Sequence, residues 1–503
     1  MRHCFWKCFV LLIALFLFEG CAITESDIET WKGTVRGPGK IIAVLLADKF
    51  SDELRVRAGV ALIEMERYDV DGIAELQGAL RKMPEETRRR LVDQMVPRLI
   101  SILGSGSKQE EGEGPPPPIQ VRAKDAAFLI LPYASASKQK ELMQALVGWL
   151  VEDFNNRSLA GNFSAEQIIR QVGSPAASQL VEAMNARLPQ QALVKLAELI
   201  GQLGDQATKR KAGERIVQIE REMEGPAFGE WIASRLRKQA AASGRQVSEN
   251  DIARGVAYNR EQFIVGGAIP AMHYLADQPV VANRLLEIAK ESNSSPEIEA
   301  RRVAALQALE GHSKPEHNQV LLRIALDSGQ PDRVRDYAFD RIGDSKDRSV
   351  IPQLWPLAVQ SASAAPNAWR VRWRLGSLLL SLGGPEVAAE WFNRLPRSSD
   401  EQYAREELYG YAERLSQMRP QPTDLLRSRL NSSAWFEQAI ALFYFERVGG
   451  EPELAAIEAL KTSNTPTKGP HWDEIKTIGA LAESVVASMR ERLGKAGATK
   501  SSP

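Results

Sequence analysis

Cysteine is almost absent from this sequence. The 503 residues contain three cysteines, Cys4, Cys8 and Cys21, and none follows Cys21. Disulfide bonds, cysteine-based metal sites and a cysteine nucleophile are therefore excluded from the body of the chain. A body without thiols fits an oxidising compartment.

The sequence also lacks an excess of charge of either sign. It has 64 Lys and Arg residues against 64 Asp and Glu residues. Proteins that bind nucleic acid usually carry a basic excess, so we expect no nucleic-acid partner. With 44% apolar and 25% charged residues the composition is that of an ordinary folded protein, although 503 residues are many for a single compact core.

Motifs for catalysis and for cofactors are missing as well. The sequence has no His-Glu dipeptide, no G-x-S-x-G elbow, and no phosphate loop in the glycine-containing stretch 31–40. His312 and His317 lie five residues apart in a polar turn and make a poor metal pair. We therefore expect no enzyme, no metal and no cofactor. Catalytic pairs of carboxylates are not excluded by the sequence, because the fold decides which carboxylates lie next to each other.

The amino terminus does carry a recognisable signal. Arg2 and Lys7 accompany an uninterrupted apolar run over residues 9–18. A membrane-spanning helix needs about 20 apolar residues, and the shorter run has the length of a signal-peptide core. We therefore predict a signal peptide over residues 1–20.

The end of this segment resembles a bacterial lipobox, in which a small residue precedes a cysteine that becomes lipidated and then N-terminal. In Phe18-Glu19-Gly20-Cys21 the glycine matches the pattern, whereas Phe18 and Glu19 depart from it. The resemblance implies lipidation of Cys21, and acyl chains contribute about 0.8 kcal/mol of membrane binding per buried CH₂. By the same resemblance, an Asp directly after the cysteine would prevent export to the outer membrane. The residue there is Ala22, which implies a location at the outer membrane, facing the periplasm. An ordinary secretory signal or an uncleaved anchor is the alternative.

The rest of the sequence shows helical periodicity and no convincing alternating strand pattern. Val334, Ala338 and Ile342, for example, form one apolar stripe on a helix. The Gly-, Glu- and Pro-rich stretch 104–118 predicts a disordered linker. The remaining predicted segments are a leader over 21–39, helical repeats over 40–103 and 119–493, with a last helix from Trp472 to Leu493, and a disordered tail over 494–503.

Two segments share one sequence phrase. Asp52-x-Leu54-Arg55-x-x-Ala58 aligns with Asp332-x-Val334-Arg335-x-x-Ala338, and Ile351-Pro352-x-Leu354 follows the second. These segments resemble HEAT repeats, which implies an all-α, HEAT/armadillo-like α-solenoid of antiparallel helix pairs. In HEAT repeats the aspartate and the arginine often bond to neighbouring repeats. The resemblance thus implies structural roles for Asp52, Arg55, Asp332 and Arg335. The sequence itself places Asp52 at a helix N-cap and Pro331 at the first residue of a helix.

Tryptophan is concentrated in the carboxyl-terminal half. Half of the ten tryptophans lie within one stretch: Trp355, Trp369, Trp373, Trp391 and Trp435. Aromatic side chains anchor interfaces, but they also fill the space between helices. Both interpretations stay open for this cluster.

Taken together, these features predict a lipid-anchored exported protein at the bacterial cell envelope, whose solenoid is a scaffold for a protein partner. A carrier of a hydrophobic ligand between helices is one alternative. An enzyme with carboxylates on the concave face is another. A solenoid fold does not name its partner.

Overall fold

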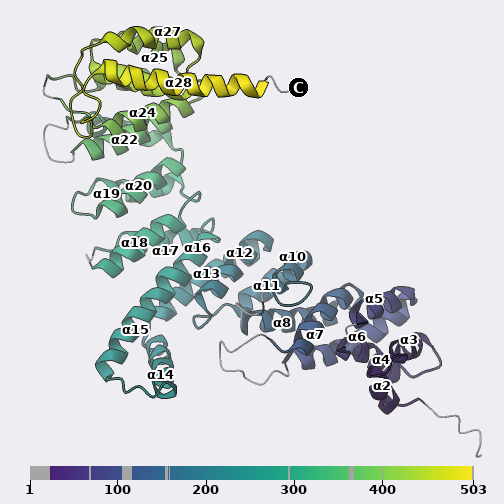
Figure 1. Ribbon diagram of the computed structural model, residues 1–503. Helices are drawn as coiled ribbons and strands as arrows, with labels where there is room; N and C mark the ends of the chain where they lie inside the picture. Colours follow the sequence, from purple (N-terminus) through teal and green to yellow (C-terminus); the bar gives the residue numbers. More distant parts are fainter. Residues whose placement is uncertain are drawn as a thin grey trace, which may run out of the picture. The chain divides into compact units, whose positions relative to one another are not determined.

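A computed structural model describes residues 23–500, apart from 67–68, 105–115, 153–156, 158, 293–294, 362–367 and 400. Helices form nearly all the regular structure of this part, and its one β-bridge, between Pro466 and Thr477, is isolated (Figure 1). The predicted all-α class is confirmed. The signal peptide, Cys21 and most of the predicted linker lie outside the described residues.

The chain divides into two compact units, and the first covers residues 1–278. Its α4, α6, α8, α11 and α13 contact one another in succession, with α3, α7 and α12 packed beside them. The helices are α2 Glu25–Lys32, α3 Gly37–Leu46, α4 Asp52–Glu64, α5 Gly72–Lys82, α6 Glu85–Gly104, α7 Pro118–Ile130, α8 Ala136–Glu152, α10 Ala165–Val172, α11 Ser174–Ala183, α12 Gln190–Leu203, α13 Gln206–Glu224, α14 Pro226–Ala242, α15 Glu249–Phe263 and α16 Ile269–His273.

The second unit covers residues 279–503 and repeats this plan. Its α18, α20, α22, α24, α26 and α28 contact one another in succession, while α17, α19, α21 and α25 pack each against one of them. The helices are α17 Pro279–Ala289, α18 Pro296–Ala308, α19 Asn318–Leu326, α20 Asp332–Asp344, α21 Ile351–Ala358, α22 Ala368–Gly383, α23 Pro385–Arg394, α24 Arg405–Gln417, α25 Thr423–Arg429, α26 Trp435–Val448, α27 Glu451–Ala459 and α28 Ile478–Lys500.

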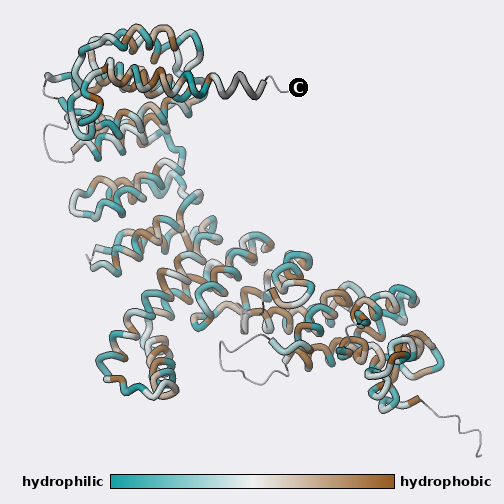
Figure 2. Tube along the Cα trace, viewed as in Figure 1, coloured by the Kyte–Doolittle hydropathy of each residue, from teal (hydrophilic) through white to brown (hydrophobic). Residues whose placement is uncertain are grey.

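Stacked helix pairs of this kind make an α-solenoid, as predicted. Many of the helices carry an apolar stripe, and hydrophobic positions recur along them in Figure 2. Val334, Ala338 and Ile342 of α20 are completely buried. A single pair cannot bury such stripes alone, so neighbouring pairs must cover them. No helix in the described part of the chain has the length and apolarity needed to cross a membrane.

Arginine side chains fasten the two helices of a pair. Arg55 of α4 donates from Nε to the carbonyl of Leu45 in the last turn of α3, at 3.0 Å. Arg335 of α20 makes the same bond to Ala325 of α19, also at 3.0 Å. Carbonyls in the last turn of a helix have no partner within it, and the helix dipole favours a cation there. The arginine of the shared phrase thus bonds within its own pair.

Both helices of the shared phrase begin one residue away from the predicted start. Ser51 caps α4, its Oγ accepting the N–H of Leu54 at 3.3 Å, and Asp52 is the first helical residue. Pro331 occupies the same place before Asp332 in α20. The N-cap prediction is therefore wrong for Asp52, and Pro331, predicted as the first helical residue, is instead the N-cap of α20.

The two aspartates also differ in their partners. Asp52 pairs with Arg90 of α6, in the next helix pair, at 2.7 Å from Nε to Oδ2. The Asp332 carboxylate instead lies 3.7 Å from Arg335 on its own helix. A bond to a neighbouring repeat, as the resemblance implies, is thus formed by Asp52.

Residues 21–39, predicted as a leader, contain helix α2. Thr24 and Asp27 form a capping box, in which the Asp27 carboxylate accepts the Thr24 N–H at 2.8 Å. Ile28 is fully buried, and α2 packs against α3 and α4. The Thr-x-x-Asp spacing is the sequence signal for this helix.

The last helix starts later and ends later than predicted. It runs from Ile478 to Lys500, so it enters the predicted tail. Trp472, predicted to begin it, is buried before it, and its indole N–H donates to the carbonyl of Tyr403 at 2.8 Å. A buried indole N–H needs such a partner. That contact and the Pro466–Thr477 bridge hold the preceding loop out of the helix.

We predict that Arg55→Met lowers the free energy of unfolding by about 1–3 kcal/mol, because it leaves the carbonyl of Leu45 buried without a partner. Asp52→Asn, which removes only a partly exposed ion pair, is the matched control and is expected to cost less than about 1 kcal/mol. Urea unfolding followed by circular dichroism measures both. Equal losses in the two variants would contradict the assigned role of Arg55.

Candidate functional site

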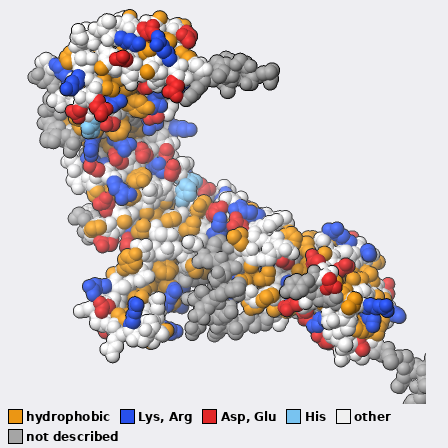
Figure 3. Space-filling view, viewed as in Figure 1, with side chains coloured by type: hydrophobic (Ala, Val, Ile, Leu, Met, Phe, Trp, Pro, Cys, Tyr) orange, Lys and Arg blue, Asp and Glu red, His pale blue; other side chains and the backbone are white. Residues whose placement is uncertain are grey.

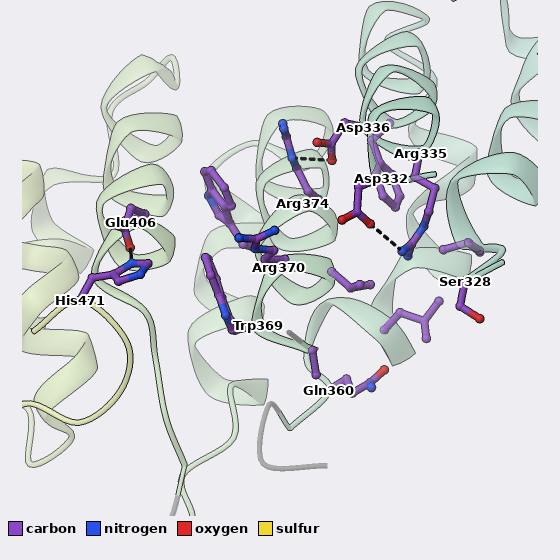
Figure 4. A pocket seen from close by; sticks show the side chains of 16 residues that line it. Ser328, Asp332, Arg335, Asp336, Gln360, Trp369, Arg370, Arg374, Glu406 and His471 are labelled. Atoms are coloured by element: carbon purple, nitrogen blue, oxygen red, sulfur yellow. Dashed lines mark hydrogen bonds and ion pairs between the residues drawn. The ribbon is translucent and has the colours of Figure 1, made fainter. Parts of the chain in front are cut away.

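A groove of about 680 Å³ in the second unit brings together four of the residues singled out in the sequence: Asp332, Arg335, Trp369 and Trp373 (Figure 4). Helices α20 and α22 supply most of its walls, and α24 and the loop before α28 supply Glu406 and His471. The lining residues are Leu326, Ser328, Asp332, Arg335, Asp336, Phe339, Leu357, Gln360, Ala368, Trp369, Arg370, Val371, Trp373, Arg374, Glu406 and His471.

Trp369 and Trp373 form a flat aromatic wall. They stand one turn apart on α22, and their rings stack with centroids 6.3 Å apart and an interplanar angle of 22°. Both side chains are partly exposed. Gly410 of α24 makes room for this arrangement, because a Cβ at that position would lie 2.3 Å from Nε1 of Trp373. Other residue types at position 410 would displace the wall.

Two arginines lie against the tryptophan rings. The guanidinium of Arg370 is 5.4 Å from the ring centroid of Trp369, and that of Arg374 is 5.2 Å from the centroid of Trp373. Such cation–π contacts orient the guanidinium groups along the aromatic wall. The ring of Trp369 also lies nearly perpendicular to that of His471, with centroids 6.2 Å apart and an interplanar angle of 89°.

Nearly all the charged side chains of the groove are paired with each other. Arg370 is the exception: no described residue offers it a carboxylate. The pairs are Arg335 with Asp332 at 3.7 Å, Arg374 with Asp336 at 3.0 Å, and His471 with Glu406 at 2.6 Å.

A buried ion network holds α22 in place beneath the tryptophans. Arg372 is 1% exposed and donates to Glu407 through Nε at 2.6 Å and Nη2 at 2.9 Å. Its Nη1 donates to Glu401 at 2.5 Å. Its guanidinium lies 4.1 Å from the ring centroid of Tyr403, and Tyr411 donates to its carbonyl at 3.0 Å. Burial, the largest influence, raises the pKa of Glu407, while the bonds from Arg372 oppose that shift.

The other three tryptophans lie outside the groove. Trp391 is completely buried. Trp355 is half-buried, with the guanidinium of Arg394 lying 4.7 Å from its ring centroid. Trp435 packs edge-on against Trp472, with centroids 5.6 Å apart. Core filling therefore accounts for Trp391, whereas Trp369 and Trp373 present partly exposed rings to the groove.

The sequence-based prediction of site residues does not include several residues of the groove. The run Trp369-Arg-Val-Arg-Trp-Arg374 was a local signal for the two arginines beside the tryptophans, because residues four apart share a helix face. Glu406, His471 and Phe339 had no such signal, because packing brings them to the groove from other helices and loops.

The described residues contain no group of three or more potential metal ligands. His317 is buried, and its Nδ1 accepts the backbone N–H of Lys314 at 3.1 Å. On the face shown in Figure 3, blue and red side chains are interspersed without a large basic patch.

Comparison with known proteins shows likeness in fold only. No family model and no curated protein matches the sequence. The karyopherin Kap121p bound to Nup53p aligns with 97% of this chain and 48% of its own, at 13% identity and a TM-score of 0.39. Kap121p bound to RanGTP aligns with 96% and 51%, at 14% identity and 0.36. A homology model of the AP-3 complex aligns with 95% and 91%, at 11% identity and 0.33.

The chain thus spans about half the length of the Kap121p structures that it matches. At these identities and TM-scores the likeness says nothing about the partners or the activity of this protein.

We predict that Arg372→Met lowers the free energy of unfolding by about 3–5 kcal/mol at pH 8, because two buried carboxylates lose their cation. The loss should be smaller at pH 5. Burial already raises the pKa of Glu407, so without Arg372 this carboxyl takes up a proton as the pH falls. Urea unfolding at both pH values measures this. A loss that is independent of pH would contradict the buried ion network.

A second pH dependence is expected from His317. Burial lowers the pKa of its imidazole, so the folded protein favours the neutral ring. The neutral ring therefore contributes to the free energy of unfolding. This stabilisation is complete above the pKa of the unfolded state, about 6.5, and is lost as the pH falls through the lower pKa of the folded state. In His317→Asn the amide oxygen can replace Nδ1 as acceptor without titrating. The variant should lose less stability than the wild type between pH 7 and pH 5 in thermal unfolding, and parallel curves would contradict this.

Proposed function

We propose that this protein is a protein-binding scaffold, tethered to a bacterial envelope membrane through a lipidated Cys21, and that the groove docks an extended segment of a partner protein. The observation that carries the proposal is the stacked, partly exposed pair Trp369 and Trp373 in an open groove. Tryptophan and arginine are the residues that most often dominate protein interfaces.

The lining of the groove favours a peptide over the alternatives. Its carboxylates, Asp332, Asp336 and Glu406, each face a cation or His471, so none stands ready as a free acid or base. The mixture of rings and ion pairs in an open groove is also a poor enclosure for a purely hydrophobic ligand. A volume of about 680 Å³ instead accommodates a few side chains of an extended segment.

The proposed tether would keep the first unit at the membrane surface. Three residues, Ala22, Ile23 and Thr24, separate Cys21 from the first residue of α2. An extended chain covers about 3.3–3.6 Å per residue, so α2 would begin within roughly 15 Å of the lipidated residue. On this proposal the residue after the lipidated cysteine is Ala22 and not Asp, which favours the outer membrane, facing the periplasm, as the location.

Photocrosslinking in intact cells tests the docking proposal. A photoreactive phenylalanine analogue at Ser328, an exposed lining residue, is expected to capture a recurrent partner, whereas the same analogue at the exposed Gln353 outside the groove is not. Adding Trp369→Ala should abolish capture, because the aromatic wall is lost. Trp355→Ala is the matched control and should retain it. Capture that survives Trp369→Ala would contradict docking in the groove.

The tether is tested by the mass of the amino-terminal peptide of protein isolated from washed membranes. We expect a peptide that begins at Cys21 and carries acyl chains. Cys21→Ser should move the protein from the membrane fraction to the soluble fraction. An unmodified Cys21, or membrane association that persists in the variant, would contradict lipid anchoring.

A further inference from the structure

We infer that the segment docked in the groove carries a carboxylate next to a prolyl or aromatic side chain, and that Arg370 and Trp369 recognise these two groups. The inference rests on the proposed function and adds the chemistry of the partner. It follows from the charges of the groove, the placement of Arg370 on an indole ring, and the fixed position of α22.

The charges of the groove are balanced except at Arg370. Three ion pairs engage the other charged lining residues, counting His471 with Glu406. Arg370 is exposed and, within the described residues, contacts the ring of Trp369 without a carboxylate partner. An unpaired guanidinium presents a fork of N–H donors that matches the two oxygens of a carboxylate. An acidic group is therefore the complementary ligand.

The carboxylate must accompany a group that covers the indole. The guanidinium of Arg370 lies 5.4 Å from the ring centroid of Trp369. An extended chain advances about 3.3–3.6 Å per residue, so one residue can lie on the ring while a residue one or two positions away reaches the guanidinium. Prolyl and aromatic side chains suit a flat indole face, and a proline also costs less conformational entropy on docking.

A basic segment fits the groove less well. To bind one, Asp336 would have to release Arg374 and Glu406 would have to release His471. Asp332 has the longest ion pair, at 3.7 Å, and is the carboxylate that a lysine would reach first. A preference for lysine over glutamate in the ligand would thus identify Asp332, and not Arg370, as the recognising group.

The helix that carries Trp369 and Arg370 is also held in place in advance of binding. Arg372, between them and Trp373 in the sequence, is fixed by Glu407 and Glu401 in the core. Because α22 is anchored in this way, the backbone positions from which Trp369 and Arg370 project are fixed without the ligand. Preorganisation of this kind raises affinity by reducing the entropy lost on binding.

The test measures binding of four fluorescent peptides to the full-length protein in detergent micelles. The peptides share Gly/Ser flanks and differ at two adjacent central positions: Pro-Glu, Pro-Gln, Pro-Lys and Ala-Glu. We expect Pro-Glu to bind about tenfold more tightly than each of the other three, because it alone supplies both groups. Equal affinities, a preference for Pro-Lys, or no binding of Pro-Glu below about 1 mM would overturn the inference.

Charge reversal at the recognising residue provides a sharper readout. Arg370→Glu should invert the preference, so that Pro-Lys binds more tightly than Pro-Glu, and Arg370→Gln should abolish it. Arg333→Glu is the matched control, because Arg333 is exposed on α20 and does not line the groove. It should leave the preference unchanged. An unaltered preference in Arg370→Glu would overturn the assignment of Arg370.

The two proposals can fail separately. If capture at position 328 persists in cells and depends on Trp369 while the peptides show no preference for glutamate, docking stands and the inference about the carboxylate is overturned. If capture fails as well, both are overturned.

Discussion

The geometry of the second unit depends on the buried ion pairs that the guanidinium of Arg372 forms with Glu407 and Glu401. The guanidinium joins α22 to Glu407 at the start of α24 and to Glu401 just before it. Removing a charge from water is costly, and the cost is offset only when the ion is fully bonded, as it is here by two carboxylates and backbone carbonyls. The relative position of α22 and α24 is therefore tightly specified, and the tryptophan wall that rises from α22 is specified with it.

In both units, other arginines bond to backbone carbonyls at helix ends. Arginines of one helix donate to carbonyls that end another, as Arg55 does in the first unit and Arg302 does in the second, where its Nε lies 3.0 Å from the carbonyl of Ala289. Apolar stripes alone would allow the helices of a pair to slide past each other. A directional bond from a buried arginine to a helix end fixes their register, while the negative end of the helix dipole favours the cation.

Local sequence patterns were sufficient for the fold. The stripe of Val334, Ala338 and Ile342 and the phrase shared with residues 52–58 predicted stacked helix pairs, and the structure has them. Helix ends were less accurate. The sequence predicts Asp52 as an N-cap because aspartate is favoured there, but Ser51 is equally favoured and lies one residue earlier. Trp472 satisfies the helical stripe, yet its bond to the Tyr403 carbonyl keeps it in a loop.

The groove could be predicted only in part. Trp369 and Trp391 look alike in the sequence, because a helical position does not tell whether another helix covers it; one lines the groove and the other is completely buried. The pairing of His471 with Glu406, 65 residues apart, depends on the path of the loop before α28. Arg370 is recognised as the unpaired charge of the groove only when the partners of all the other charged lining residues are known. Those partners are set by the fold and not by the local sequence.

A partner that binds in the groove would cover the amino-terminal turn of α22, and hydrogen–deuterium exchange of the full-length protein with and without its captured partner detects this. The first turn of α22 has backbone N–H groups without partners within the helix, so a segment lying across Trp369 should slow their exchange. Docking in the groove predicts protection at residues 368–371 and none at the exposed α14–α15 hairpin. Protection confined to other helices, with residues 368–371 unchanged, would contradict it.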